Sequence, residues 1–129
     1  MVGIGKTWRF TFRNGLAVDL AAAGVVIAGR FIRFDPNGQQ EFSTDSVIVT
    51  SNAVVNGAYG NGAEQDNATT KWLGGDFVAT LIAPSGANGR VDVFFERKVN
   101  GQWPTAGMGR MITSIDVAAT GTYNKDFSI

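Results

Sequence analysis

Residues 7–15 read Thr7-Trp8-Arg9-Phe10-Thr11-Phe12-Arg13-Asn14-Gly15, an alternation of aromatic and polar side chains that ends in an Asn-Gly pair. A β-strand places successive side chains on opposite faces, so the three aromatic residues share one face and the two arginines share the other. The closing Asn-Gly pair tolerates the backbone conformations of a tight turn. This stretch therefore predicts a strand with one buried face.

The same alternation recurs along the rest of the 129-residue chain. It predicts further strands at residues 25–34, 77–82, 91–98, 110–117 and 122–129. Asn100-Gly101 is typical of a hairpin turn, here leading into a segment around Trp103, and Asp35-Pro36-Asn37-Gly38 indicates another turn. We expect an all-β fold, a single antiparallel β-sandwich or jelly roll of about eight strands, in one domain spanning residues 1–129. The only helix candidate is the Ala-rich stretch 16–23, which Gly24 could cap.

The composition excludes several classes of function. The chain has no His and no Cys, which removes Ser-His-Asp and Cys-His nucleophiles, disulfides and the usual zinc and haem ligands. Eleven basic and eleven acidic side chains leave no excess of positive charge for a nucleic-acid partner. The N-terminal segment lacks the pattern of a secretory signal, and no apolar run reaches the length of a membrane span, so we expect neither a signal nor a membrane partner.

Residues 52–70 form a polar, glycine-rich segment that we expect to be a long loop. Two interpretations stay open, a mobile connection between sheets or a loop whose Tyr59, Glu64 and Asp66 contact a neighbouring subunit or ligand. The acidic residues lack the spacing of a calcium-binding loop, so we predict no metal and no cofactor.

Two short motifs have simpler explanations. Gly5-Lys6-Thr7 resembles the end of a phosphate-binding loop, but the first glycine of that motif is missing and a strand, not a helix, is predicted to follow. Asn67-Ala68-Thr69 matches a glycosylation sequon, which we expect to be accidental.

Carboxylates and aromatic residues raise two alternative functions. Asp92 and Glu96 are predicted on one exposed strand face, where a glycosidase would place its acid and nucleophile, although ordinary strand patterning explains them equally well. Trp72, Trp103 and Tyr59 are near predicted loops or strand ends, where flat rings stack on sugars, but both tryptophans would also suit the core.

The C-terminal part of the chain carries a resemblance to a known group of proteins. Residues 89–104 read GRVDVFFERKVNGQWP, followed by Gly107-Met108-Gly109-Arg110, by residues 112–115 and by a final strand, GTYNKDFSI, at residues 121–129. Upstream, residues 61–67 lead into residues 72–77. Together these segments resemble small β-sandwich structural proteins of tailed-bacteriophage particles.

The resemblance implies a non-enzymatic structural component of a tailed-phage virion, a capsid decoration or accessory protein that assembles as a homo-oligomer. Its implied partners are other copies of itself and the major structural protein of the virion, with assembly in the host cytoplasm. The alternative is a carbohydrate-binding sandwich, such as a phage fibre or receptor-recognition domain. We take as candidate contact residues Tyr59, Glu64, Asp66, Trp72, Trp103, Phe127 and Ile129.

Overall fold

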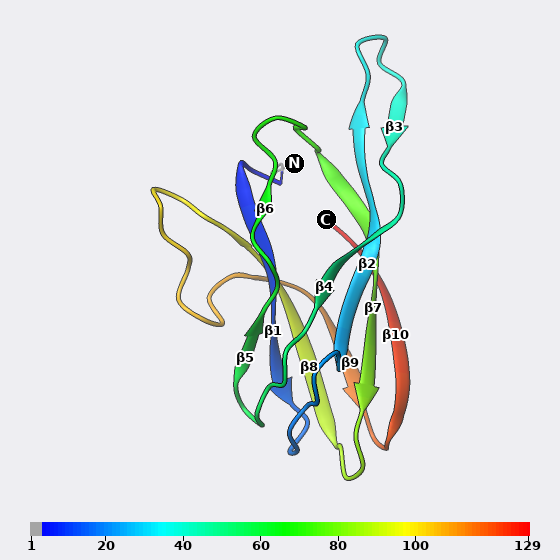
Figure 1. The fold of residues 1–129 in the computed structure, drawn as a ribbon, viewed down its shortest axis with the longest axis vertical. Helices are drawn as coiled ribbons and strands as arrows, with labels where there is room; N and C mark the ends of the chain where they lie inside the picture. The colour runs from blue at the N-terminus through cyan, green and yellow to red at the C-terminus, as the bar shows by residue number, and fades with distance from the viewer. Residues whose placement is uncertain (1–3) are drawn as a thin grey trace.

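The computed structural model describes residues 4–129 as two antiparallel sheets packed face to face (Figure 1). The first sheet has the order β5-β1-β8-β9, and β6 also pairs with β1. Its strands are β1 (Thr7–Gly15), β5 (Tyr59–Asn61), β6 (Gln65–Asp66), β8 (Gly89–Arg97) and β9 (Arg110–Val117). The second sheet has the order β10-β7-β2-β3, and β4 also pairs with β2. Its strands are β2 (Val25–Phe34), β3 (Gln40–Phe42), β4 (Ser46–Thr50), β7 (Gly74–Ala83) and β10 (Gly121–Ser128).

This architecture confirms the all-β sandwich prediction, with ten strands in the described part of the chain instead of about eight. The strands predicted at residues 25–34 and 110–117 have those same bounds in the structure. No helix in the described residues is long and apolar enough to cross a membrane.

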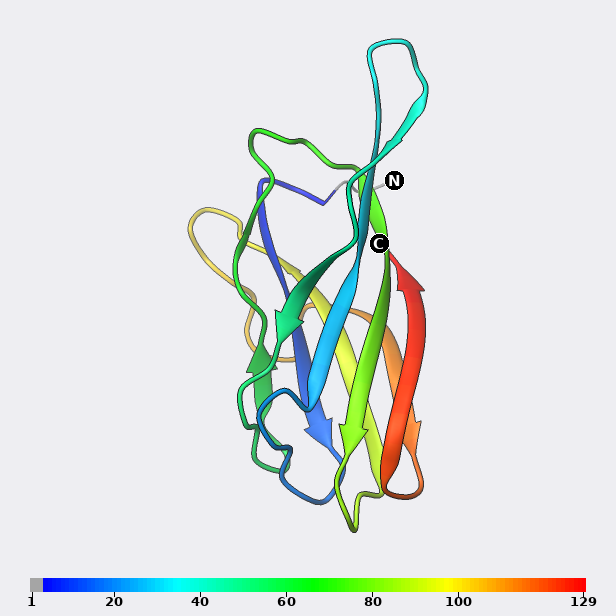
Figure 2. The ribbon, with the colours of Figure 1, turned by 45° about the vertical axis from the view of Figure 1, so that its right-hand side comes forward.

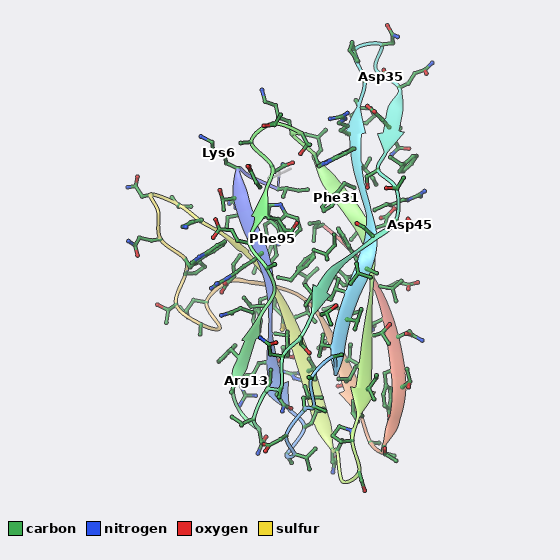
Figure 3. The ribbon with its side chains drawn as sticks, viewed as in Figure 1. Lys6, Arg13, Phe31, Asp35, Asp45 and Phe95 are labelled. Atoms are coloured by element: carbon green, nitrogen blue, oxygen red, sulfur yellow. The ribbon has the colours of Figure 1, made fainter. Side chains whose placement is uncertain are left out.

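The core is organised around the aromatic face of β1. Trp8, Phe10 and Phe12 are at most 1% exposed, as their alternation predicts. Trp8 contacts Phe95 of the first sheet and Phe31 of the second, with ring centroids 5.6 and 5.8 Å apart, and Figure 3 labels both phenylalanines. The aromatic residues thus join the two sheets, and β1 and β8 lie side by side at the centre of the first one.

Residues 16–23 form no helix, contrary to the candidate assignment. Ala17 and Ala23 have positive φ angles of 64° and 59°, which a right-handed helix cannot contain. The buried amide of Asn14 holds the connection instead, because its nitrogen donates to the carbonyl oxygens of Val18 and Val54. Leu16 and Leu20 are therefore buried from an irregular loop and not from a helix face.

The prediction of one long loop at residues 52–70 is wrong. β5 and β6 lie within them, and both pair with β1 along the edge of the first sheet. Gly60 of β5 is required there, since a Cβ atom at this position would collide with the ring of Phe12. The strands have only three and two residues, which is too short for an alternating pattern to show.

Asn14 and Gly15 end strand β1, as predicted, but they pair with β8 and form no tight turn. The other two predicted turns are present. Asn100 and Gly101 have the positive φ angles of a two-residue turn, 54° and 73°, and Val99 bridges to Gln102. The segment around Trp103 forms no strand, however, because β8 pairs with β9 instead. The Asp35–Gly38 turn closes a hairpin of β2 and β3 that projects beyond the sandwich (Figures 1 and 2).

Candidate functional site

The outer face of the first sheet is covered by the loop at residues 98–109, which we call the β8–β9 loop. Beneath it, Nε of Arg9 donates to Oε1 of Glu96 at 2.9 Å, and the Glu96 side chain is only 1% exposed. The guanidinium of Arg9 also lies 4.2 Å from the ring centroid of Trp103 in the loop. This arrangement anchors the loop to the sheet through a buried ion pair and a cation–π contact.

Asp92 and Glu96 lie on one face of β8, as predicted, but the expectation that they are exposed there is wrong. Both residues are buried, because Glu96 lies beneath the loop and Asp92 is between β1 and β9. Nε of Arg90 lies 3.0 Å from Oδ1 of Asp92, but its N–H does not point at this oxygen, which has no hydrogen-bond partner. A hydrolase needs an acid that reaches its substrate, and neither carboxylate is placed for that.

Both candidate tryptophans are half-buried, and a cation lies over one face of each ring. Trp72 stacks on Phe31 at 6.0 Å, and the guanidinium of Arg33 lies 4.4 Å from its ring centroid. Trp103 has Arg9 over its ring and Lys98 at 5.6 Å. The two rings therefore already serve intramolecular contacts, Trp103 with Arg9 of the first sheet and Trp72 with Phe31 of the second.

Three polar-segment candidates lie along the first sheet. Tyr59 is on its outer face beside Phe94, with Gly107 of the β8–β9 loop against its hydroxyl. Glu64 lies 3.6 Å from Nζ of Lys98, at the start of the same loop. Asp66, in β6, is exposed and accepts a hydrogen bond from the backbone of Ala68. The structure thus brings Tyr59, Glu64 and Trp103 to one loop.

The two C-terminal candidates lie in the second sheet or beside it. Phe127 is buried and stacks on Phe77, with centroids 5.7 Å apart, so its ring is part of the core and not available to a partner. Ile129 packs against the core and exchanges backbone hydrogen bonds with Gly75. These residues support the sheet from within.

The sequon residue Asn67 has a structural role. Its amide nitrogen donates to the carbonyl oxygens of Gly5 and Trp72, and its oxygen accepts from the backbone of Trp72 and the hydroxyl of Thr70. The residue is 6% exposed. A folded chain therefore offers no free amide for glycosylation, and Thr7 of the Gly5-Lys6-Thr7 motif begins strand β1, as predicted.

Sequence reasoning missed the projecting β2–β3 hairpin, which we call the arm (residues 32–42). On one side of it Phe34 and Phe42 are 58% and 42% exposed. On the other side Arg33 donates two hydrogen bonds to Glu41 and one to the carbonyl oxygen of Thr70. Hydrogen bonding to Glu41 raises the pKa of the Arg33 guanidinium above its ordinary value.

The tip of the arm is also ordered. Oδ1 of Asp35 accepts hydrogen bonds from the backbone N–H groups of Asn37 and Gln39. With the Arg33 hydrogen bonds at its base, the arm is a fixed projection that presents aromatic side chains to solvent. The missed signal was a pair of phenylalanines flanking a strong turn sequence, which places them on neighbouring strands.

The outer face of the second sheet is bare, in contrast to that of the first. Val47, Val78 and Ile82 are exposed there, and the aromatic side of the arm continues the same face. A hollow on this face is lined by Ala28, Val78 and the charged residues Arg30, Asp45, Asp76 and Asp126. Arg30 lies 4.0 Å from Asp76 in an exposed ion pair, which leaves an excess of negative charge around the hollow.

No protein-family model, curated protein or solved structure matches this chain.

Proposed function

We propose that the protein is a non-enzymatic structural component of a tailed-phage virion, a capsid decoration or accessory protein that assembles as a homo-oligomer. One observation carries the proposal, the bare outer face of the second sheet with its ordered aromatic arm. Exposed apolar groups that form a fixed, continuous surface are characteristic of protein–protein contacts. The resemblance of residues 56–129 to phage sandwich proteins supplies the particle as the setting.

The accessible surface of the chain is slightly larger than that of an average compact monomer. Its accessible surface is 7124 Å² at a mass of 13.7 kDa. A compact monomer of that mass exposes about 6,600 Å². The projecting arm and loop account for a shape less compact than that of an average monomer (Figure 2).

The geometry gives less support to the alternative functions. A hydrolase would need an accessible carboxylate pair, whereas Glu96 is paired with Arg9 beneath a loop. The two tryptophans considered for glycan stacking each have one face covered, because Arg9 lies over Trp103 and Arg33 over Trp72. A structural role needs neither an accessible carboxylate pair nor a sugar-stacking tryptophan. It can use the exposed apolar residues of the second sheet and the arm.

The experiment is to purify virus particles by density gradient from the culture that produces the protein, and to identify the proteins they contain by mass spectrometry. We expect the chain to sediment with intact particles, to be released by partial dissociation and to leave genome packaging intact when deleted. A chain found only in the soluble fraction would contradict a virion role. Retention on a glycan array that Trp103→Ala abolishes without unfolding would instead favour the carbohydrate-binding alternative.

A further inference from the structure

The β8–β9 loop is an exposed apolar surface with a basic border. Met108 and Val99 are 76% and 67% exposed, the highest values among the large hydrophobic residues described. Arg97 and Lys98 precede the loop tip and Arg110 follows it. Glu64 lies 3.6 Å from Nζ of Lys98, so Arg97 and Arg110 supply the remaining positive charge of the border. The loop is held in place by the Trp103 contact with Arg9, so its apolar tip is presented on a supported frame.

The hollow on the second sheet has the opposite character. Its apolar floor includes Val78 and Ala28, and its border carries Asp45, Asp76 and Asp126, with Arg30 as the one cation among its lining residues. The three aspartates do not form a metal-binding group within the part of the chain that the structure describes. A partner for this hollow should therefore be apolar at its centre and basic around it, which is the character of the β8–β9 loop.

The two surfaces are on opposite sides of the molecule. In Figures 1 and 2 the loop, drawn in yellow, extends to the left of the first sheet, while β7 and β10 lie to the right, and Figure 3 labels Asp45 on that side. A chain cannot place its own loop in its own hollow across the sandwich. A second copy can do so, and the pair then keeps one loop and one hollow free.

We propose that copies of this chain associate head to tail, with the β8–β9 loop of one copy seated in the acidic hollow of the next. Such a heterologous contact joins different surfaces of identical subunits, and it closes into a ring or continues as an array. The proposal rests on the homo-oligomeric role proposed above and specifies its interface. A two-fold contact of hollow on hollow is disfavoured, because it would bring two sets of aspartates together.

The test uses two variants, one at each surface, studied by size-exclusion chromatography with light scattering over a concentration series. Met108→Glu places a carboxylate on the loop tip, and Val78→Glu places one on the floor of the hollow. Each is expected to weaken association of the full chain by about a hundred-fold, because it buries an unpaired charge at the contact. Val55→Glu, at an exposed valine outside both surfaces, is the matched control and should associate like the unmodified chain.

Mixing the two variants gives the decisive result. The Val78→Glu copy keeps an intact loop and the Met108→Glu copy keeps an intact hollow, so an equimolar mixture should form a one-to-one heterodimer that does not grow further. Unchanged thermal midpoints would show that the variants are folded.

Several results would overturn the interface. An unmodified chain that stays monomeric throughout the series would do so, and so would variants that remain monomeric when mixed. A loss of association in Val78→Glu but not in Met108→Glu would indicate a two-fold contact. Association that neither variant weakens would reject this interface while leaving the proposed virion role to its own test in purified particles.

Discussion

Arg9 and Glu96 connect strands β1 and β8 through an ion pair beneath the β8–β9 loop. Removing one partner of a buried pair leaves the other charge in a poorly hydrated site, which is strongly destabilising. We expect Arg9→Ala to lower the free energy of unfolding by about 3 kcal/mol, measured by urea denaturation. It should also increase protease cleavage within residues 98–109, because the loop loses its contact between Arg9 and Trp103.

Arg30→Ala is the control for this prediction, because its ion pair with Asp76 is exposed and 4.0 Å long. Its effect should stay within about 0.5 kcal/mol. Equal losses of stability in the two variants would mean that burial of Glu96 contributes nothing to the role of the pair.

Asn67 joins the N-terminal segment to the end of the 67–72 turn through its buried amide. Asn67→Ala leaves the carbonyl oxygens of Gly5 and Trp72 without this donor, and we expect a loss of about 2 kcal/mol in the free energy of unfolding. Thr69→Ala destroys the sequon equally well but changes an exposed residue, so it should leave the stability unchanged. If Thr69→Ala destabilised the chain as much, the buried amide would not be the cause.

For single residues, the sequence predicts which face of a strand a side chain occupies, but not which side chain it pairs with. The alternation in residues 7–13 places Trp8, Phe10 and Phe12 in the core, as observed. The pairing of Arg9 with Glu96 depends on a strand register across 87 positions and on the loop that covers both residues. The buried amide of Asn67 was equally hidden, because its four hydrogen bonds are made by backbone and side-chain groups that come together only in the folded chain.

Strand edges decide how a sandwich meets other chains. Within residues 4–129, β10 pairs with β7 on one side and with no strand on the other. Lys125 lies opposite Ala79 on the core-facing side of this edge strand, and its side chain is exposed. An inward charge on an edge strand blocks pairing with another sheet. The position of Lys125 therefore favours association through the loop and the hollow over edge-to-edge pairing.

We expect Lys125→Val to make the chain aggregate as its concentration rises, because the edge of β10 loses its charge. The midpoint of thermal unfolding at low concentration should stay close to that of the unmodified chain, since Lys125 is exposed. Light scattering over a concentration series measures the effect. Lys125→Arg keeps the charge and should remain soluble, whereas aggregation of both variants would assign the effect to something other than charge.

Elements were predictable in proportion to their length. The strands with eight or more residues carry enough alternating positions to be recognised, and all of them were predicted at or near their observed bounds. β3, β5 and β6 have three residues or fewer and exist only because β1 and β2 offer them a free edge. Such strands are fixed by tertiary pairing, which a local pattern does not contain.

For the whole molecule, a formal net charge of zero conceals two surfaces of opposite sign. The basic border of the β8–β9 loop and the acidic border of the hollow contribute opposite signs to the total, which is zero over all charged residues. Composition alone could therefore not indicate a charged interface, and the candidate residues chosen from the sequence included neither Met108 nor Val78. The separation of positive from negative charge is seen only in the folded chain, where the loop and the hollow lie on opposite sides.

Opposite charges at the contact predict a salt dependence with a definite sign. Raising the ionic strength from about 0.1 to about 1 M shortens the screening length from about 10 to about 3 Å. Attraction between the loop and the hollow should weaken, so the oligomer fraction measured by sedimentation velocity should fall at constant protein concentration. The thermal midpoint of the isolated fold should change little, because the ion pair of Arg9 and Glu96 is shielded from solvent. Association that strengthens with salt would mean that like-charged surfaces meet, as in a contact of hollow on hollow, and would contradict the head-to-tail arrangement.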